Sequence, residues 1–374
     1  MIDCKFFYDK LQSLGLNFFT GVPDSLLKDI CAYITENTIA NNHIISSNEG
    51  SSIGLAIGYH LSTDKIPVVY MQNSGLGNII NPILSLADKK VYSIPMLLLI
   101  GWRGEPNVKD EPQHIKQGEI TLGMLDTMEI DYEILPDKNE LVEETLFRLV
   151  SNIKQNSAPA ALIIKKGTFS NYQLNDNNSK FEMNREDAIK IILDNLPKDS
   201  AVVSTTGKTS REVYEFRVNN NDNKNVDFLT VGGMGHCNQI ALGIAMQKPD
   251  KNIVCIDGDG AALMHLGALG IIGDISPKNF MHIVINNGSH DSVGGQPTIG
   301  FKISFSEIAK KLRYKECLTF QNHKELKNYL LKKTQFNGPV LIEVLVNKGA
   351  RTDLGRPKST PIQNKNNFKD MLNK

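Results

Sequence analysis

Two polar clusters that follow apolar runs are the segments of this chain best suited to chemistry. The run 252–256 leads into Asp-Gly-Asp-Gly at 257–260, and the run 281–285 leads into Asn-Asn-Gly-Ser at 286–289. Two adjacent parallel strands would bring a carboxylate and an amide oxygen together at their carboxyl ends. Such oxygen ligands suit Mg²⁺, and a glycine-rich turn that opens a helix, expected over 261–272, suits a diphosphate group.

Each cluster taken singly is an ordinary turn signal, so the spacing between them decides the interpretation. Twenty-five residues separate Gly260 from Asn286, with a strand–helix–strand pattern around them. This combination favours a metal–diphosphate site over two unrelated turns.

Length, charge and cysteine usage limit the class of protein. The chain has 374 residues, enough for two domains, and its 41 basic and 41 acidic residues give no sign of a nucleic-acid partner. Its five cysteines are scattered, as expected in a reducing cytoplasm. The charged N-terminus predicts an amphipathic helix rather than a signal peptide, and the apolar run 94–100 is too short to cross a membrane. We expect a cytoplasmic protein with no membrane partner.

Apolar runs alternate with helical patterns along the chain, which predicts an α/β fold with mostly parallel sheets covered by helices. The expected strands are 67–71, 94–100, 160–164, 201–203, 227–231, 252–256, 281–285 and 339–345. A polar, Asn-rich segment at 171–184 predicts a linker between a domain at 1–170 and a domain at 185–374 that includes a C-terminal tail.

The two halves also match each other when the first is shifted by 185 positions. Gly75 then falls on Gly260 in a gapless match of about fifty residues, which predicts a structural repeat. The candidate functional residues lie where the halves differ. Asp259 of the second half corresponds to Ser74 of the first, and Glu49 of the first half corresponds to Met234 of the second.

The Gly258-Asp259-Gly260 turn and the later Asn287 resemble the cofactor signature of thiamine diphosphate decarboxylases. The resemblance implies two similar thiamine diphosphate-binding domains, pyrimidine-binding at 1–170 and diphosphate-binding at 185–374. It also implies two cofactors, thiamine diphosphate and Mg²⁺. The implied metal ligands are Asp259, Asn287 and the backbone carbonyl of Ser289, and the implied phosphate donors are the amides of Gly258, Gly260 and Ala261.

Two further segments fit this family. The loop with Gly232, Gly233 and Met234 resembles the one that contacts the cofactor rings, and Thr206 lies in a weaker candidate phosphate loop. Glu49 before a helix reads, by itself, as an N-terminal cap carboxylate. Within the resemblance it matches the catalytic glutamate that hydrogen-bonds the aminopyrimidine ring of the cofactor.

The chain lacks the third, central domain of most family members and in this resembles the compact phosphonopyruvate and sulfopyruvate decarboxylases. The resemblance implies a small 2-oxo acid substrate, 3-phosphonopyruvate, which is decarboxylated to phosphonoacetaldehyde and CO₂ in phosphonate biosynthesis. A phosphonate needs cationic and N–H or O–H donors. The candidate cations or N–H donors are Arg103, Lys109, His114, Lys116, Arg211 and Arg356. Ser25 is a candidate O–H donor, and Asp24 is a candidate for relaying protons or positioning the substrate.

Other functions stay open at this point: sulfopyruvate decarboxylation, a 2-oxo acid carboligase, a dinucleotide-dependent oxidoreductase, or a silent binding module. No GxGxxG opens a strand–helix unit, which counts against the oxidoreductase. Retention of Glu49, Asp259 and Asn287 counts against the silent module. The resemblance further implies a homo-oligomer built on a dimer, with active sites shared between subunits.

Overall fold

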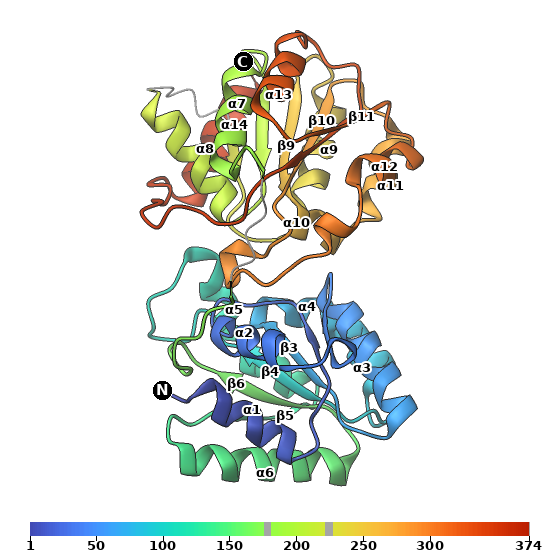
Figure 1. Cartoon of the computed structure of the whole chain (residues 1–374), viewed down its shortest axis with the longest axis vertical. Helices are drawn as coiled ribbons and strands as arrows, with labels where there is room; N and C mark the ends of the chain where they lie inside the picture. The colour runs from blue at the N-terminus through green and yellow to red at the C-terminus, as the bar shows by residue number, and fades with distance from the viewer. Residues whose placement is uncertain (176–180, 221–226, 374) are drawn as a thin grey trace. The chain divides into compact units, whose positions relative to one another are not determined.

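The structure is a computed structural model that describes residues 1–175, 181–220 and 227–373. Its contacts divide the chain into two units, 1–175 and 176–374, drawn in Figure 1. Residues 176–180 of the predicted linker 171–184 lie outside the described residues, so the linker and the domain limits stay predictions.

The N-terminal unit is built on a six-stranded parallel sheet with the order β2-β1-β3-β4-β6-β5. Its strands are β1 (Phe19–Gly21), β2 (His43–Ile45), β3 (Val68–Gln72), β4 (Leu97–Gly101), β5 (Asp131–Ile134) and β6 (Ala160–Ile164). Strands β3, β4 and β6 are apolar along most of their length because helices bury both of their faces.

Helices cover both faces of this sheet (Figure 1). Side chains of α1 (Cys4–Ser13), α2 (Lys28–Asn37) and α6 (Asn139–Asn156) pack on one face. Those of α3 (Glu49–Thr63), α4 (Leu76–Pro82), the π-helix η3 (Ile83–Ala87) and α5 (Pro112–Thr127) pack on the other. Short 3-10 turns are η1 (Ala40–Asn42) and η2 (Asn73–Gly75). Helix α1 shows the helical period, because it buries Cys4, Phe7, Tyr8 and Leu11.

The C-terminal unit contains a second six-stranded parallel sheet, with the order β11-β12-β10-β9-β7-β8. Its strands are β7 (Ala201–Ser204), β8 (Asp227–Leu229), β9 (Ile253–Gly258), β10 (Phe280–Asn286), β11 (Glu316–Phe320) and β12 (Val340–Leu345). The predicted α/β class with two helix-covered parallel sheets is confirmed.

Helices again cover both faces of the second sheet. One face is covered by α7 (Arg185–Asn195), α8 (Lys208–Asn219) and α13 (His323–Leu331). The other is covered by α9 (Cys237–Gln247), α10 (Asp259–Met264), α11 (Ala268–Ile275), α12 (Phe305–Lys311) and α14 (Pro361–Leu372). Short 3-10 turns are η4 (Asp291–Val293) and η5 (Gly300–Lys302).

The two sheets have the same connectivity. Read from β8, the order of the second sheet is β8-β7-β9-β10-β12-β11. This is the order of the first sheet with each strand number increased by six. The constant shift of 185 does not extend through the whole repeat, however. Val68 pairs with Leu97, whereas its counterpart Ile253 pairs with Phe280 and not with residue 282, so the offset changes by two residues.

The eight predicted strands all exist; the one at 160–164 has the predicted limits, and the limits of the other seven are shifted. The segment 94–100 becomes strand only from Leu97, because Pro95 has no N–H for a ladder. The single predicted helix 261–272 is instead two short helices, α10 and α11. Four short strands were not predicted: β1, β2, β5 and β11. Three of them are sheet edges, where one side is open and a continuous apolar run is not needed.

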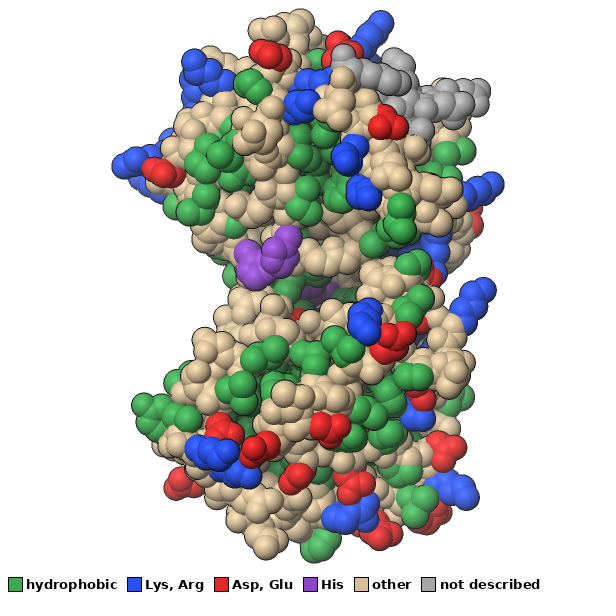
Figure 2. Space-filling view, turned by 180° about the vertical axis from the view of Figure 1, so that it is seen from behind, with side chains coloured by type: hydrophobic (Ala, Val, Ile, Leu, Met, Phe, Trp, Pro, Cys, Tyr) green, Lys and Arg blue, Asp and Glu red, His purple; other side chains and the backbone are tan. Residues whose placement is uncertain are grey.

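Side chains of both charges are interspersed over the face of the molecule in Figure 2, in keeping with the balanced composition. Among the described residues, no helix combines the length and hydropathy needed to span a bilayer.

Candidate active site

Asp259 lies where the sequence places it, at the carboxyl end of β9 and the start of α10. Its side chain is 2% exposed and accepts a short hydrogen bond from Oγ1 of Thr298. Burial raises the pKa of this carboxyl to about 7, although N–H groups of Gly260 and Asn287 partly offset that effect. The same contacts confirm that Asp259 and the second strand end lie together.

Asn287 follows β10 and is held by a buried ionic network that the sequence analysis missed. Its Nδ2 donates to Oδ2 of Asp291 over 2.7 Å, and its Oδ1 accepts from the backbone N–H of Ser289 over 3.0 Å. Asp291 also accepts from Arg185 over 2.8 Å, and Arg185 forms two 2.8 Å hydrogen bonds with Glu212. These hydrogen bonds fix the orientation of the Asn287 amide, with Nδ2 toward Asp291 and Oδ1 toward the Ser289 N–H.

Asn286, the first residue of the Asn pair, has a structural role. Its Nδ2 donates to the Gly300 carbonyl over 2.8 Å and to Oε1 of Glu343 over 2.9 Å. A Cβ on Gly300 would lie 2.4 Å from Oδ1 of Asn286 and 2.5 Å from Oδ2 of Asp259. The segment Thr298–Gly300 therefore closes against the carboxylate only because residue 300 has no side chain.

The turn from β9 into α10 is lined by Met234 and His290, which come from two different loops. The methyl carbon of Met234 lies 3.5 Å from the position that a Gly260 Cβ would occupy, and His290 lies 3.0 Å from it. Desolvation lowers the pKa of His290 to about 4, so this half-buried ring is neutral at physiological pH. Ala261 follows in the same turn and is buried, whereas the Gly258 amide already donates to Oδ1 of Asp257 over 2.9 Å.

The glycine loop and the Thr206 loop flank this turn. Gly233 and Gly235 both have positive φ, at 64° and 89°, which explains glycine on either side of Met234. Thr206 follows β7 and is half-buried, and a Cβ on the next residue, Gly207, would lie 2.7 Å from Oγ of Ser292. Gly232 lies in the first of these loops and is half-buried. The structure thus brings these predicted residues to one edge of the second sheet.

Glu49 begins α3 in the other unit and is 5% exposed. Asn48 is the N-cap, since its Oδ1 accepts from the Ser51 N–H over 2.9 Å, so the cap interpretation of Glu49 is not needed. Oε2 of Glu49 instead accepts from Nδ2 of Asn78 over 2.7 Å. A Cβ on Gly75 would lie 2.7 Å from Oε1, so a glycine is required beside this carboxylate.

Asp24, Ser25 and Arg103, three of the predicted substrate residues, form one connected group. Nη1 of Arg103 donates to Oγ of Ser25 over 2.7 Å, and Oγ of Ser25 lies 3.4 Å from Oδ1 of Asp24. Asp24 is fully buried, and desolvation raises the pKa of its carboxyl to about 6. A Cβ on Gly101, at the end of β4, would lie 2.0 Å from the Asp24 carboxylate.

Asp110 completes this group and was not predicted. Its carboxylate accepts two hydrogen bonds from the Arg103 guanidinium, one of them 2.8 Å long, and another from the Gly104 N–H over 2.8 Å. The pKa of His114 is lowered to about 4 by desolvation and by the Arg103 charge, so His114 is a neutral ring and not a second cation. Arg211, in α8 of the other unit, is half-buried, and burial lowers its pKa. It forms no ion pair with any residue that the structure describes.

Two family models of known proteins match this chain, one in each of its two units. Residues 4–130 match the family model "Thiamine pyrophosphate enzyme, N-terminal TPP binding domain", and residues 205–344 match "Thiamine pyrophosphate enzyme, C-terminal TPP binding domain".

Three curated proteins are similar over most of their length. Phosphonopyruvate decarboxylase of Streptomyces viridochromogenes is 31% identical, with 94% of this chain and 90% of that protein aligned. The Streptomyces hygroscopicus protein of the same name is 30% identical over 96% and 91% of the two chains. Sulfopyruvate decarboxylase of Methanosarcina acetivorans is 26% identical over 80% and 79%.

Proposed function

The chain belongs to the thiamine pyrophosphate enzyme family, and from this premise we propose that it decarboxylates 3-phosphonopyruvate to phosphonoacetaldehyde and CO₂. The observation that carries the proposal is the near full-length similarity to two phosphonopyruvate decarboxylases at about 30% identity. The lower similarity to a sulfopyruvate decarboxylase makes 3-sulfopyruvate the second candidate substrate.

The edge of the second sheet fits the diphosphate end of thiamine diphosphate with Mg²⁺. A buried carboxylate, an amide oxygen and a backbone carbonyl are hard oxygen donors, and we assign them to Asp259, Asn287 and Ser289. The absence of a side chain at Gly300 lets its loop pack against that carboxylate, and the absence of one at Gly260 leaves room beside Met234 and His290. The amides of Gly260 and Ala261 are assigned to phosphate oxygens, and Gly232, Gly233 and Met234 to the cofactor rings, with Thr206 beside the phosphates.

When bound, thiamine diphosphate supplies the electron sink that decarboxylation of a 2-oxo acid requires. The protein orients the cofactor and the substrate and transfers protons. Glu49 is assigned to the aminopyrimidine ring nitrogen, where its carboxyl group exchanges a hydrogen-bonded proton. Asn78, donating over 2.7 Å, holds the second carboxylate oxygen and so fixes the direction of the first.

The group around Arg103 is assigned to the far end of the substrate. A phosphonate carries close to two negative charges and binds best to guanidinium and hydroxyl donors. Arg103 shares its charge with Asp110, so Ser25 and the remaining guanidinium N–H groups provide the directional contacts. Because His114 is neutral, it contributes a hydrogen bond rather than a charge. Asp24, with a raised pKa, is suited to holding a proton near the substrate. Arg211 is assigned as an additional cation.

A direct assay separates the candidate substrates. Release of CO₂ is measured with phosphonopyruvate, sulfopyruvate and pyruvate at equal concentrations, with Mg²⁺ and thiamine diphosphate in excess. We expect the largest kcat/KM with phosphonopyruvate. A larger value with sulfopyruvate would replace the substrate assignment but keep the decarboxylase, and CO₂ release that survives removal of all Mg²⁺ would contradict the metal assignment.

We also propose a homo-oligomer, based on an apolar surface of the N-terminal unit. Helices α4, η3 and α5 expose large apolar side chains, and a groove of about 570 Å³ lies among them. The groove is lined by Ile80, Leu84, Glu119, Ile120, Gly123, Met124, Thr127 and Met128. Such a surface is costly to leave in water, so a second copy of the chain is the proposed occupant. Figure 2 shows apolar side chains gathered between charged ones over this unit.

Mixing two inactive variants tests whether the sites are shared. If Glu49 and Asp259 of one site come from different subunits, random dimers of Glu49→Gln and Asp259→Ala protein contain half heterodimers, each with one intact site. Activity should then return to about one quarter of that of the wild type on subunit exchange, while each variant alone stays inactive. Light scattering that finds only monomer, or no recovery despite proven exchange, would exclude this arrangement.

A further inference from the structure

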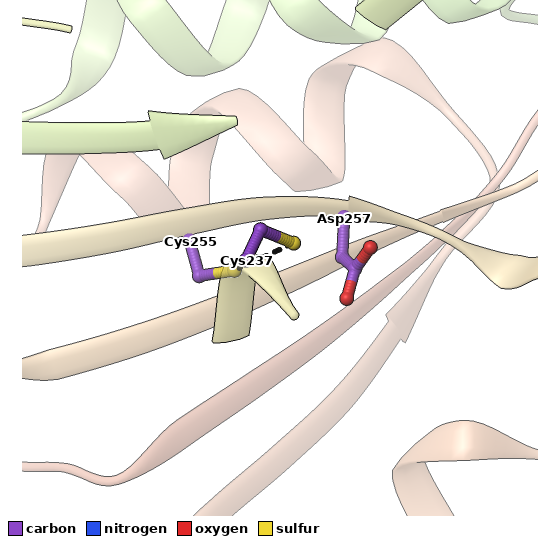
Figure 3. Close-up of side chains that lie close together, drawn as sticks. All are labelled: Cys237, Cys255 and Asp257. Carbon is purple, nitrogen blue, oxygen red and sulfur yellow. Dashed lines mark hydrogen bonds between the residues drawn. The ribbon is translucent and has the colours of Figure 1, made fainter. Parts of the chain in front are cut away.

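A second cluster of potential metal ligands lies in the core beneath the Asp259 turn. Cys255 and Asp257 are two residues apart on β9 and therefore project from the same face of the sheet. Cys237, the first residue of α9, packs on that face, as Figure 3 shows. His282 on β10 is the register partner of Cys255. All four side chains are buried, with exposures of 0–1%.

The distances within the cluster suit a tetrahedral ion. The two sulfur atoms are 3.7 Å apart, and Nε2 of His282 lies 3.3 Å from Oδ2 of Asp257. The ligand atoms of Cys237, Cys255 and Asp257 all lie within 4.8 Å of one another, whereas His282 lies outside this mutually close group and reaches it through Asp257. Zinc bonds of about 2.3 Å to sulfur and about 2.0–2.1 Å to nitrogen or oxygen, at tetrahedral angles, would separate the sulfurs by about 3.8 Å and the N···O pair by about 3.3 Å. Both measured pair distances match these values, and His282 must shift toward the two sulfur atoms to complete the tetrahedron.

The surrounding groups hold the ligands in this orientation. Oδ1 of Asp257 accepts from the Gly258 N–H over 2.9 Å, and Oδ2 faces the cluster, where it also accepts from Nδ2 of Asn238 over 3.4 Å. Tyr314 Oη lies 3.5 Å from Nδ1 of His282, so a proton on Nδ1 would leave Nε2 free to bind a metal. Nothing in the proposed decarboxylation uses Cys237, Cys255 or His282.

We propose that Cys237, Cys255, Asp257 and His282 form a structural zinc site, separate from the Mg²⁺ of the cofactor. Thiolates and imidazole favour zinc, whereas the Asp259 site offers only hard oxygens. On binding, each thiol loses its proton, two S–H bonds are replaced by two Zn–S bonds, and two protons pass to solvent. The imidazole binds as the neutral base. No oxidant or reductant is required.

The site would join the first turn of α9 to the strand that delivers Asp259. Asp257 precedes Asp259 by two residues, and Cys237 follows the Met234 loop by three. A closed four-ligand site at this position would stabilise both cofactor loops without taking part in the reaction. Zinc removal should therefore lower the unfolding temperature of the protein even in the absence of substrate.

Metal analysis of the full-length protein tests the proposal. The protein is treated with a zinc-selective chelator in excess Mg²⁺, dialysed, and then offered Zn²⁺ or Co²⁺ as the probe. We expect one Zn²⁺ per chain, an X-ray absorption spectrum with two sulfur neighbours, and sulfur-to-cobalt charge-transfer bands with Co²⁺. The matched control is Cys317→Ala, in the same unit but outside the cluster, which should bind one equivalent like the wild type.

The variants Cys237→Ala and Cys255→Ala should each lose at least nine tenths of the zinc. If either fails to fold, the cobalt spectrum of the wild type decides by itself. Zinc binding below one tenth of an equivalent, or cobalt bands without sulfur character, would overturn the proposal. A thiol count of three instead of five in denatured, chelator-treated protein would also overturn it, because the pair would then be a disulfide.

Discussion

Gly300→Ala tests whether the loop after Thr298 is part of the proposed metal site. The added methyl group would lie 2.4 Å from Oδ1 of Asn286 and 2.5 Å from Oδ2 of Asp259. Both oxygens belong to buried side chains fixed by other hydrogen bonds, so neither can move away freely. The loop must shift instead and weaken the hydrogen bond from Thr298 to Asp259.

The expected size follows from overpacking. Inserting a methyl group into a well-packed site costs about 1–3 kcal/mol. If that strain falls on the metal-bound state, Mg²⁺ affinity at saturating thiamine diphosphate should fall about 5- to 150-fold, at tenfold per 1.4 kcal/mol. If the strain is already present in the metal-free folded protein, the free energy of unfolding should decrease by the same amount, about 1–3 kcal/mol. Calorimetric titration with Mg²⁺ and denaturant unfolding measure the two quantities.

Gly267→Ala is the matched control, because a Cβ there meets no atom within 4 Å. It should change neither the Mg²⁺ affinity nor the stability by more than about 0.5 kcal/mol, as for other substitutions without such contacts. Wild-type values of both quantities in Gly300→Ala would refute the close packing of this loop against Asp259.

Three other perturbations follow from the same contacts. Glu49→Gln should bind thiamine diphosphate normally yet release CO₂ at least about 100-fold more slowly, because proton exchange at the cofactor is lost; a near-normal rate would remove Glu49 from the mechanism. Asp24 has a folded-state pKa of about 6, raised from 3.8, so its favourable contribution to stability is complete below pH 3.8 and is lost as the pH rises through about 6. That loss of unfolding free energy is about 3 kcal/mol at most, and Asp24→Asn should remove it from the pH dependence of unfolding. If the wild type and the variant have identical pH profiles of unfolding, the raised pKa of the Asp24 carboxyl is contradicted. Arg185→Met leaves the buried Glu212 and Asp291 carboxylates without their cation and should destabilise the protein by about 3–5 kcal/mol, whereas Arg351→Met, at more exposed ion pairs, should cost under about 1 kcal/mol in the same unfolding assay.

The sequence was sufficient for the architecture because parallel strands buried on both faces leave continuous apolar runs. Strands such as β4, β6, β9 and β10 were recognised for this reason. It was also sufficient for the repeat, since the two sheets share one strand order. The edge strands β2, β5 and β11 escaped prediction, because a short strand with one open side needs little apolar surface.

Short-range motifs also determined which residues to consider for the cofactor. Asp259, Asn287 and Glu49 stand at strand or helix ends whose position follows from the local pattern. Their assignment to metal or cofactor stays a prediction.

Only the tertiary structure decided which distant side chains support them. Arg185, Glu212 and Asp291 meet around Asn287 from three segments far apart in sequence, and Asn78 reaches Glu49 across 29 residues. The same holds for Cys237 and His282 beside Cys255, which share no motif. Contacts of this kind depend on strand register and helix packing, and these are set by the whole core rather than by any local run of residues.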